Sequence, residues 1–138
     1  MAGYSGTPLA KKLGIKDGST IALSNAPPTL DAELDLSLLE GVVVRPRLKG
    51  PLDVVLVFVK SLSELEHRFP PAQRALHERG GLWVAWPKRT SGVATDLTEN
   101  VVRDVGLRAG LVDTKVCAVD DTWSGLRFVY RLRDRSGN

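Results

Sequence analysis

Cysteine is nearly absent from this sequence, which has one thiol, Cys117, in 138 residues. A single cysteine excludes an intramolecular disulfide, so we expect a protein of a reducing compartment, the cytoplasm. Long apolar runs are also missing. The longest, 54–59, is far too short to cross a bilayer, and the N-terminus lacks the pattern of a signal peptide. We therefore expect no membrane association.

The familiar catalytic and metal-binding motifs are missing as well. The sequence contains no GxSxG, no Walker-type loop, no HExxH and no CxxC. The main hydrolase, nucleotide-triphosphatase and zinc classes therefore have no motif to support them. We assign no catalytic residue, no metal ligand and no cofactor.

The composition that is present is that of one globular domain. Hydrophobic residues make up 43% and charged residues 25%, values that argue against a disordered chain. The formal net charge of +3 allows an anionic partner without requiring one, and a nucleic-acid partner is not favoured. We expect an N-terminal arm with a short helix over 1–18, a single α/β domain over 19–132 and a polar tail over 133–138.

Apolar strands and amphipathic helices alternate along the domain. Strands are predicted at 19–24, 42–45, 52–59, 82–86, 114–119 and 126–132, with the main helices in 61–79 and 97–106. This alternation predicts a three-layer α/β sandwich with a mostly parallel sheet. Only a few turn residues separate the last two strands, so they should pair as an antiparallel hairpin at one edge.

Two helix starts and one helix end can be predicted from local signals. Ser61 with Glu64, and Asp96 with Glu99, have the spacing of a capping box, and Glu99 can pair with Arg103 one turn later. The pair Pro70-Pro71 should kink or split the first helix, and Gly80-Gly81 should end it.

The pattern from LDVVLVFV to GLRFVYRL, about 50–132, resembles the second half of a Rossmann-type methyltransferase. The resemblance implies the sheet order 2-1-3-4-6-5, with the last strand inserted antiparallel. The family's glycine-rich cofactor loop after the first strand is replaced by IALSNAPPTL, which has no glycine. Arg45 stands where the family has a ribose-binding acid, and both departures weaken S-adenosylmethionine binding.

The whole chain also resembles an uncharacterised bacterial family catalogued only as a domain of unknown function. The stretches that carry this resemblance are GYSGTPLAKKLGI, SNAP, LWVAWPKRTSGVATDLTENVVR and GLVDTKVCAVDDTWSGLRFV. It implies no particular activity.

Polar residues follow several of the predicted strands. In an open α/β sheet ligands bind beyond the carboxyl ends of the strands, so these residues predict a polar rim. Trp123 joins it only if the fifth strand runs parallel to the fourth. Lys88 and Arg103 would neutralise an anion, Ser91 and Thr95 would donate hydrogen bonds, and Trp123 would stack. The candidate ligand-binding residues are Asn25, Lys60, Lys88, Ser91, Thr95, Asp96, Asn100, Arg103 and Trp123.

Capping and surface charge can also account for several of these residues, so three functions stay open. The first is a non-catalytic ligand-binding or regulatory module for an anionic or nucleotide-like small molecule. The second is an interaction module whose basic edge strand, with Arg127 and Arg131, binds a partner or a second copy of the chain. The third is an atypical S-adenosylmethionine-dependent methyltransferase.

Overall fold

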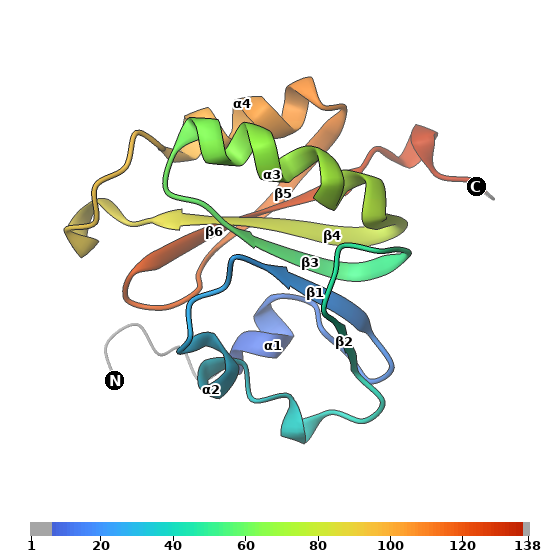
Figure 1. The fold of residues 1–138 in the computed structure, drawn as a ribbon. Coiled ribbons are helices and arrows are strands. Elements are labelled where there is room, and N and C mark those ends of the chain that lie inside the picture. Colours follow the sequence, from blue (N-terminus) through green and yellow to red (C-terminus); the bar gives the residue numbers. More distant parts are fainter. Residues whose placement is uncertain (1–6, 137–138) are drawn as a thin grey trace.

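The computed structural model describes residues 7–136, which form a six-stranded mixed sheet between two layers of helices (Figure 1). The sheet order is β2-β1-β3-β4-β6-β5, as the methyltransferase resemblance implied. The strands are β1 (Thr20–Ser24), β2 (Val43–Arg45), β3 (Leu52–Phe58), β4 (Leu76–Pro87), β5 (Leu111–Ala118) and β6 (Trp123–Tyr130). The predicted α/β sandwich is confirmed.

Strand directions decide which loops share an edge. Strands β1 to β4 pair in parallel, and β6 pairs antiparallel with both β4 and β5. Strand β5 therefore runs in the same direction as β4, and the predicted C-terminal hairpin is present. The connection from β5 to β6 consequently lies at the same edge as the carboxyl ends of the parallel strands. We call this edge the carboxyl rim and the opposite edge the amino edge.

The two faces of the sheet are covered unequally (Figure 1). The longer helices, α3 (Leu62–Ala75) and α4 (Glu99–Arg108), cover one face. Leu65 and Phe69 of α3 are buried there in one cluster with Phe128 of β6. The short helices, α1 (Leu9–Lys12) and α2 (Leu30–Leu34), lie on the other. There Leu13 is buried, and its carbonyl accepts a 2.9 Å hydrogen bond from the Trp83 indole N–H, which ties the N-terminal segment to the sheet.

The prediction that Gly80-Gly81 ends the first helix was wrong. Helix α3 ends at Ala75, and β4 begins at Leu76 and passes through both glycines. A Cβ at Gly80 would lie 2.8 Å from the backbone oxygens of Leu52 and Asp53. The neighbouring strand approaches so closely that only glycine fits, which is a strand role and not a helix-ending role. The proline pair does not split α3, because Pro70 and Pro71 both lie inside it.

The predicted cap of the second helix was wrong by two positions. Thr98, not Asp96, is the N-cap of α4, and its hydroxyl accepts a 3.2 Å hydrogen bond from the Val101 N–H. The predicted pair between Glu99 and Arg103 is confirmed at 2.6 Å. The Ser61 cap of α3 is also confirmed, since its hydroxyl accepts from the Glu64 N–H at 3.1 Å.

The basic edge strand proposed from the sequence is not an edge. Strand β6, which carries Arg127, lies between β4 and β5, while β2 and β5 form the two edges of the sheet. Arg131 lies beyond the end of β6, before the 3-10 turn Leu132–Asp134. The antiparallel insertion of the last strand leaves it no free edge for pairing.

None of the helices in residues 7–136 has the length and apolar character needed to span a membrane.

Candidate functional site

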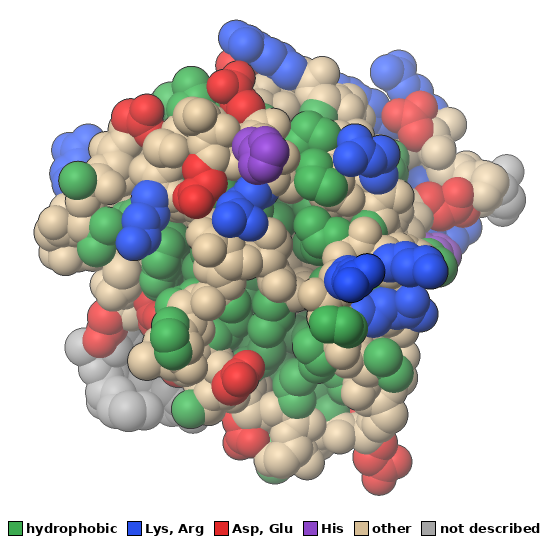
Figure 2. All heavy atoms as spheres, viewed as in Figure 1, with side chains coloured by type: hydrophobic (Ala, Val, Ile, Leu, Met, Phe, Trp, Pro, Cys, Tyr) green, Lys and Arg blue, Asp and Glu red, His purple; other side chains and the backbone are tan. Residues whose placement is uncertain are grey.

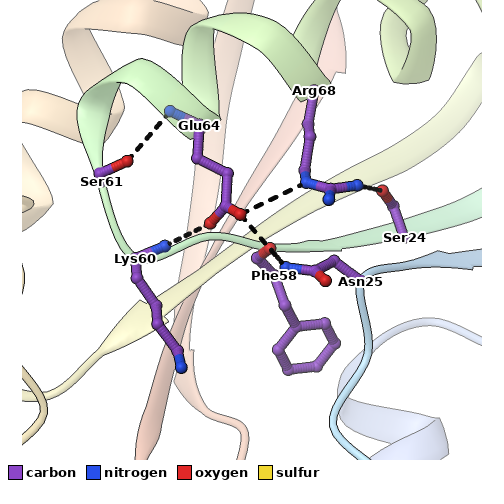
Figure 3. Close-up of polar contacts among 7 residues, drawn as sticks. All are labelled: Ser24, Asn25, Phe58, Lys60, Ser61, Glu64 and Arg68. Atoms are coloured by element: carbon purple, nitrogen blue, oxygen red, sulfur yellow. Dashed lines mark hydrogen bonds and ion pairs between the residues drawn. The ribbon is translucent and has the colours of Figure 1, made fainter.

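The carboxyl ends of β1 and β3 are joined by a hydrogen-bonded network (Figure 3). Asn25 follows β1 in the left-handed conformation, with φ 62°, and its amide donates to the Phe58 carbonyl oxygen at 3.0 Å. The same amide lies 3.5 Å from Glu64 Oε2. Arg68, one turn further along α3, has its Nε 3.7 Å from that oxygen and donates to the Ser24 hydroxyl at 3.3 Å.

Glu64 is the centre of this network because it contacts three elements. Its other carboxylate oxygen accepts the Lys60 backbone N–H at 2.8 Å, so one side chain holds the loop after β1, the turn after β3 and the start of α3. The Lys60 side chain points away from the carboxylate (Figure 3). The network therefore fixes the backbone of the rim and leaves the Lys60 ammonium group outside it.

The loop after β4 is attached to the same turn. The Thr95 hydroxyl donates to the Lys60 carbonyl at 2.6 Å, and Asp96 accepts the Leu62 N–H at 2.9 Å. Asp96 thus satisfies a donor at the start of α3, not of α4. Four predicted site residues, Asn25, Lys60, Thr95 and Asp96, are brought together here, though mainly through bonds to backbone.

Lys88 and Ser91 lie further out along the loop after β4. The Lys88 N–H donates to the Thr122 carbonyl at 2.7 Å, which links this loop to the β5–β6 connection. Ser91 folds back on the loop, where its hydroxyl donates to the Lys88 carbonyl at 2.7 Å and accepts the Val93 N–H at 3.1 Å. Ser91 is therefore engaged in shaping a turn.

Asn100 and Arg103 are occupied elsewhere. Arg103 contacts Glu99, Asn100 at 2.9 Å and Asp113 of β5 at 2.9 Å. The hydrogen bonds to Glu99 and Asp113 raise the pKa of Arg103, and the one from Arg103 lowers the pKa of Asp113. The structure places this cation in a cluster that ties α4 to β5, away from the network around Glu64.

Trp123 begins β6 and points into the core. It is 8% exposed and meets Phe58 edge-to-face, with ring centroids 5.1 Å apart. Its neighbour Asp120 accepts the N–H groups of Thr122 and Trp123, both at 2.8 Å. The connection shares the rim as the strand direction requires, but the indole covers the core and does not form an open stacking wall.

An acidic region occupies the β5–β6 side of the rim. Burial and then the charge of Asp120, with a smaller effect of Asp121, raise the pKa of Glu33 on α2. A negative ligand would be repelled by these carboxylates, so only the β3 and β4 side of the rim favours an anion. Figure 2 shows acidic and basic side chains interspersed over this face of the molecule.

Sequence reasoning did not assign Ser24, Glu64 and Arg68 to the rim. Glu64 was recognised only as a capping-box residue, and its spacing from Arg68 is that of a helical i,i+4 pair. Those two local signals together would have placed an acidic and a basic side chain at the start of α3.

Arg45, at the carboxyl end of β2, has a buried Nε with no hydrogen-bond partner among the described residues.

The fold is similar to those of methyltransferases and of proteins solved with S-adenosylmethionine. Magnesium protoporphyrin IX methyltransferase of Synechocystis, solved with S-adenosylmethionine, is 10% identical with a TM-score of 0.58, over 89% of this chain and 74% of that one. Precorrin-6y C5,15-methyltransferase of Geobacter metallireducens is 11% identical with a TM-score of 0.56, over 89% and 86%. Fibrillarin of Aeropyrum pernix, with natively bound S-adenosylmethionine, is 15% identical with a TM-score of 0.51, over 92% and 70%.

At such low identity these similarities establish the methyltransferase-like Rossmann fold and nothing about activity. No curated protein sequence matches the chain. A family model does match, over residues 10–132, which is most of the chain and includes the residues around the rim. The chain belongs to DUF3052, a family of proteins of unknown function.

Proposed function

We propose that this chain is a non-catalytic module that binds an anionic small molecule at the carboxyl rim, through Lys60 and Lys88. The observation that carries the proposal is that these two lysines follow the adjacent central strands β3 and β4, yet neither ammonium group has an ion pair or hydrogen bond among residues 7–136. Two unneutralised cations at the ligand-binding end of such a sheet attract an anion.

A non-catalytic role is supported by how the nearby carboxylates are used. Glu64 accepts the Lys60 N–H and contacts Asn25 and Arg68, while Asp96 accepts the Leu62 N–H. A general base must be within reach of a substrate proton with its lone pairs available. Here the two acids serve to hold the backbone of the rim.

S-adenosylmethionine is the cofactor that the fold implies, and the residues present do not fit it well. The loop after β1 reads Asn25-Ala26-Pro27-Pro28, so side chains stand where a glycine-rich loop lets the cofactor approach the backbone. The Asn25 amide is bonded across to the Phe58 carbonyl at the end of β3. Arg45 ends β2 in place of an acid.

Methyl transfer stays the second candidate because similar structures contain S-adenosylmethionine or its product. One experiment separates the two candidates. Thermal unfolding is followed with inorganic phosphate, ADP and S-adenosylmethionine, since a ligand of the native state raises the melting temperature. The proposal expects phosphate or ADP to stabilise the wild type and S-adenosylmethionine to have no effect.

Variants then locate the site. Lys60→Ala and Lys88→Ala should each reduce the stabilisation by the anion, and the double variant should reduce it further. Lys49→Ala, an exposed lysine in the turn before β3, is the matched control for loss of one charge. Stabilisation that is as large in the double variant as in the wild type would refute the rim site, and stabilisation by S-adenosylmethionine alone would favour the methyltransferase candidate.

A further inference from the structure

A concave space of about 570 Å³ lies at the amino edge of the sheet, away from the rim described above. It is bounded by α1, the connection to β1, the start of β3 and the body of β5 and β6. Six basic side chains line it, against two carboxylates. We call it the basic pocket, and its basic residues are Lys11, Lys12, Lys16, Arg79, Lys115 and Arg127.

The two acids of the basic pocket are engaged with backbone. Asp17 accepts the Glu40 N–H at 2.9 Å, and Asp53 accepts the Thr20 N–H at 2.8 Å. Neither makes an ion pair with a lysine of the pocket within the described chain. The carboxylates therefore fix the connections around β1, and within residues 7–136 the four lysines of the pocket and Arg127 have no ion pair.

Lys115 and Arg127 show that the positive charge is concentrated by the fold. They lie directly opposite each other on β5 and β6, where like charges destabilise a sheet. Among the described residues, the Lys115 ammonium donates only to the Lys12 carbonyl, at 3.4 Å, and the Arg127 guanidinium only to the Thr114 hydroxyl, at 3.3 Å. An anion bound between the two cations would be attracted by both, which would offset their mutual repulsion.

Arg127 is also seated in a specific way. Its guanidinium lies against Gly81 of β4, where a Cβ would be 2.5 Å from Nε. The side chain is half-buried, and burial followed by the charge of Arg135 lowers its pKa. A partly desolvated guanidinium on a glycine floor is suited to bidentate binding of a phosphate group.

We propose that the basic pocket binds the phosphate chain of a compact polyanion, either a free polyphosphate or the polyphosphate of a nucleotide. A volume of this size is that of a small-molecule site. The cations line one hollow from chain segments far apart in sequence. This arrangement fits a compact ligand better than an extended nucleic-acid strand.

The test is calorimetric titration of the wild-type protein with inorganic tripolyphosphate, ATP, adenosine and a short single-stranded oligonucleotide. We expect tripolyphosphate and ATP to bind and adenosine not to bind. Equal affinities would identify the phosphate chain alone as the ligand, and tighter binding of ATP would identify a nucleotide. Binding of the oligonucleotide without tripolyphosphate would overturn the proposal in favour of a nucleic-acid surface.

Two kinds of variant make the test specific. Lys115→Ala should weaken tripolyphosphate binding by about tenfold or more, since a charged hydrogen bond contributes about 1.5–3 kcal/mol. Gly81→Ala keeps every charge but displaces the Arg127 guanidinium, so it should also weaken binding, with circular dichroism showing a folded chain. Lys49→Ala, which removes one exposed lysine outside the basic pocket, should leave this affinity unchanged.

The controls separate this site from the carboxyl rim. If Lys60→Ala and Lys88→Ala abolish tripolyphosphate binding while Lys115→Ala and Gly81→Ala do not, the polyanion binds at the rim and the basic pocket is refuted. If no anion stabilises the chain through Lys60 and Lys88, but tripolyphosphate binding depends on Lys115, the proposed function is refuted and the basic pocket is supported.

Discussion

The bond from Asn25 to the Phe58 carbonyl offers a direct test of how the rim is held. Asn25 has two structural tasks, because it adopts φ 62° and its amide spans the 3.0 Å to β3. Replacing it by alanine removes a hydrogen bond, about 0.5–1.5 kcal/mol, and removes the short polar side chain that lets asparagine adopt the left-handed region, where other side chains cost about 1–2 kcal/mol. We expect Asn25→Ala to destabilise the fold by about 2 kcal/mol.

Asn25→Gly separates the two tasks, since glycine adopts the left-handed conformation without strain. It should lose the hydrogen bond alone and cost about 1 kcal/mol. The measurement is urea unfolding of both variants beside the wild type, with equal m-values as the control for two-state behaviour. If Asn25→Gly lowers the free energy of unfolding as much as Asn25→Ala does, strain in the left-handed conformation does not contribute. If neither variant changes stability, the bond does not hold the rim.

Two further predictions concern packing and pH. Gly106 of α4 faces Phe128, and a Cβ there would overlap the ring. Gly106→Ala should therefore lower stability by about 1–3 kcal/mol despite its better helix propensity, and Phe128→Leu in the same chain should recover part of the loss. Equal stability of Gly106→Ala and wild type would contradict this packing. The folded-state pKa of Glu33 is raised above its ordinary 4.5, so its ionised form opposes folding at neutral pH and the penalty disappears as the pH falls through the folded pKa. Glu33→Gln should raise the melting temperature at pH 7, and the gain should close below about pH 4.5; a gain that persisted in acid would have another cause.

Much of the fold was predictable because its signals are local and continuous. The run Leu52–Phe58 is apolar at nearly every position, as a central strand with both faces buried must be, and the closing hairpin follows from a short connection. The sheet order came from the methyltransferase resemblance and not from periodicity. The errors arose where one residue type serves two purposes. Gly80 and Gly81 read as a helix end, but the close approach of β3 requires glycine at position 80, and Gly81 lies against the Arg127 guanidinium.

The site was less predictable because its contacts join distant segments. Asn25 and Lys60 could be placed at one rim from strand order, but the sequence does not reveal that the Asn25 amide bonds to Phe58. Arg103 looked like an available cation until the fold placed Asp113 beside it. The basic pocket escaped notice for the same reason, since Lys12 and Lys115 stand 103 positions apart.

The central claim is that this methyltransferase fold has a carboxyl rim that does not accept S-adenosylmethionine. Calorimetric titration of the wild-type chain with millimolar S-adenosylmethionine tests it most directly. We expect no saturable heat, because the loop after β1 has no glycine and its Asn25 amide is bonded to the Phe58 carbonyl at the end of β3. Saturable binding that Glu64→Ala or Arg45→Ala alters would contradict it.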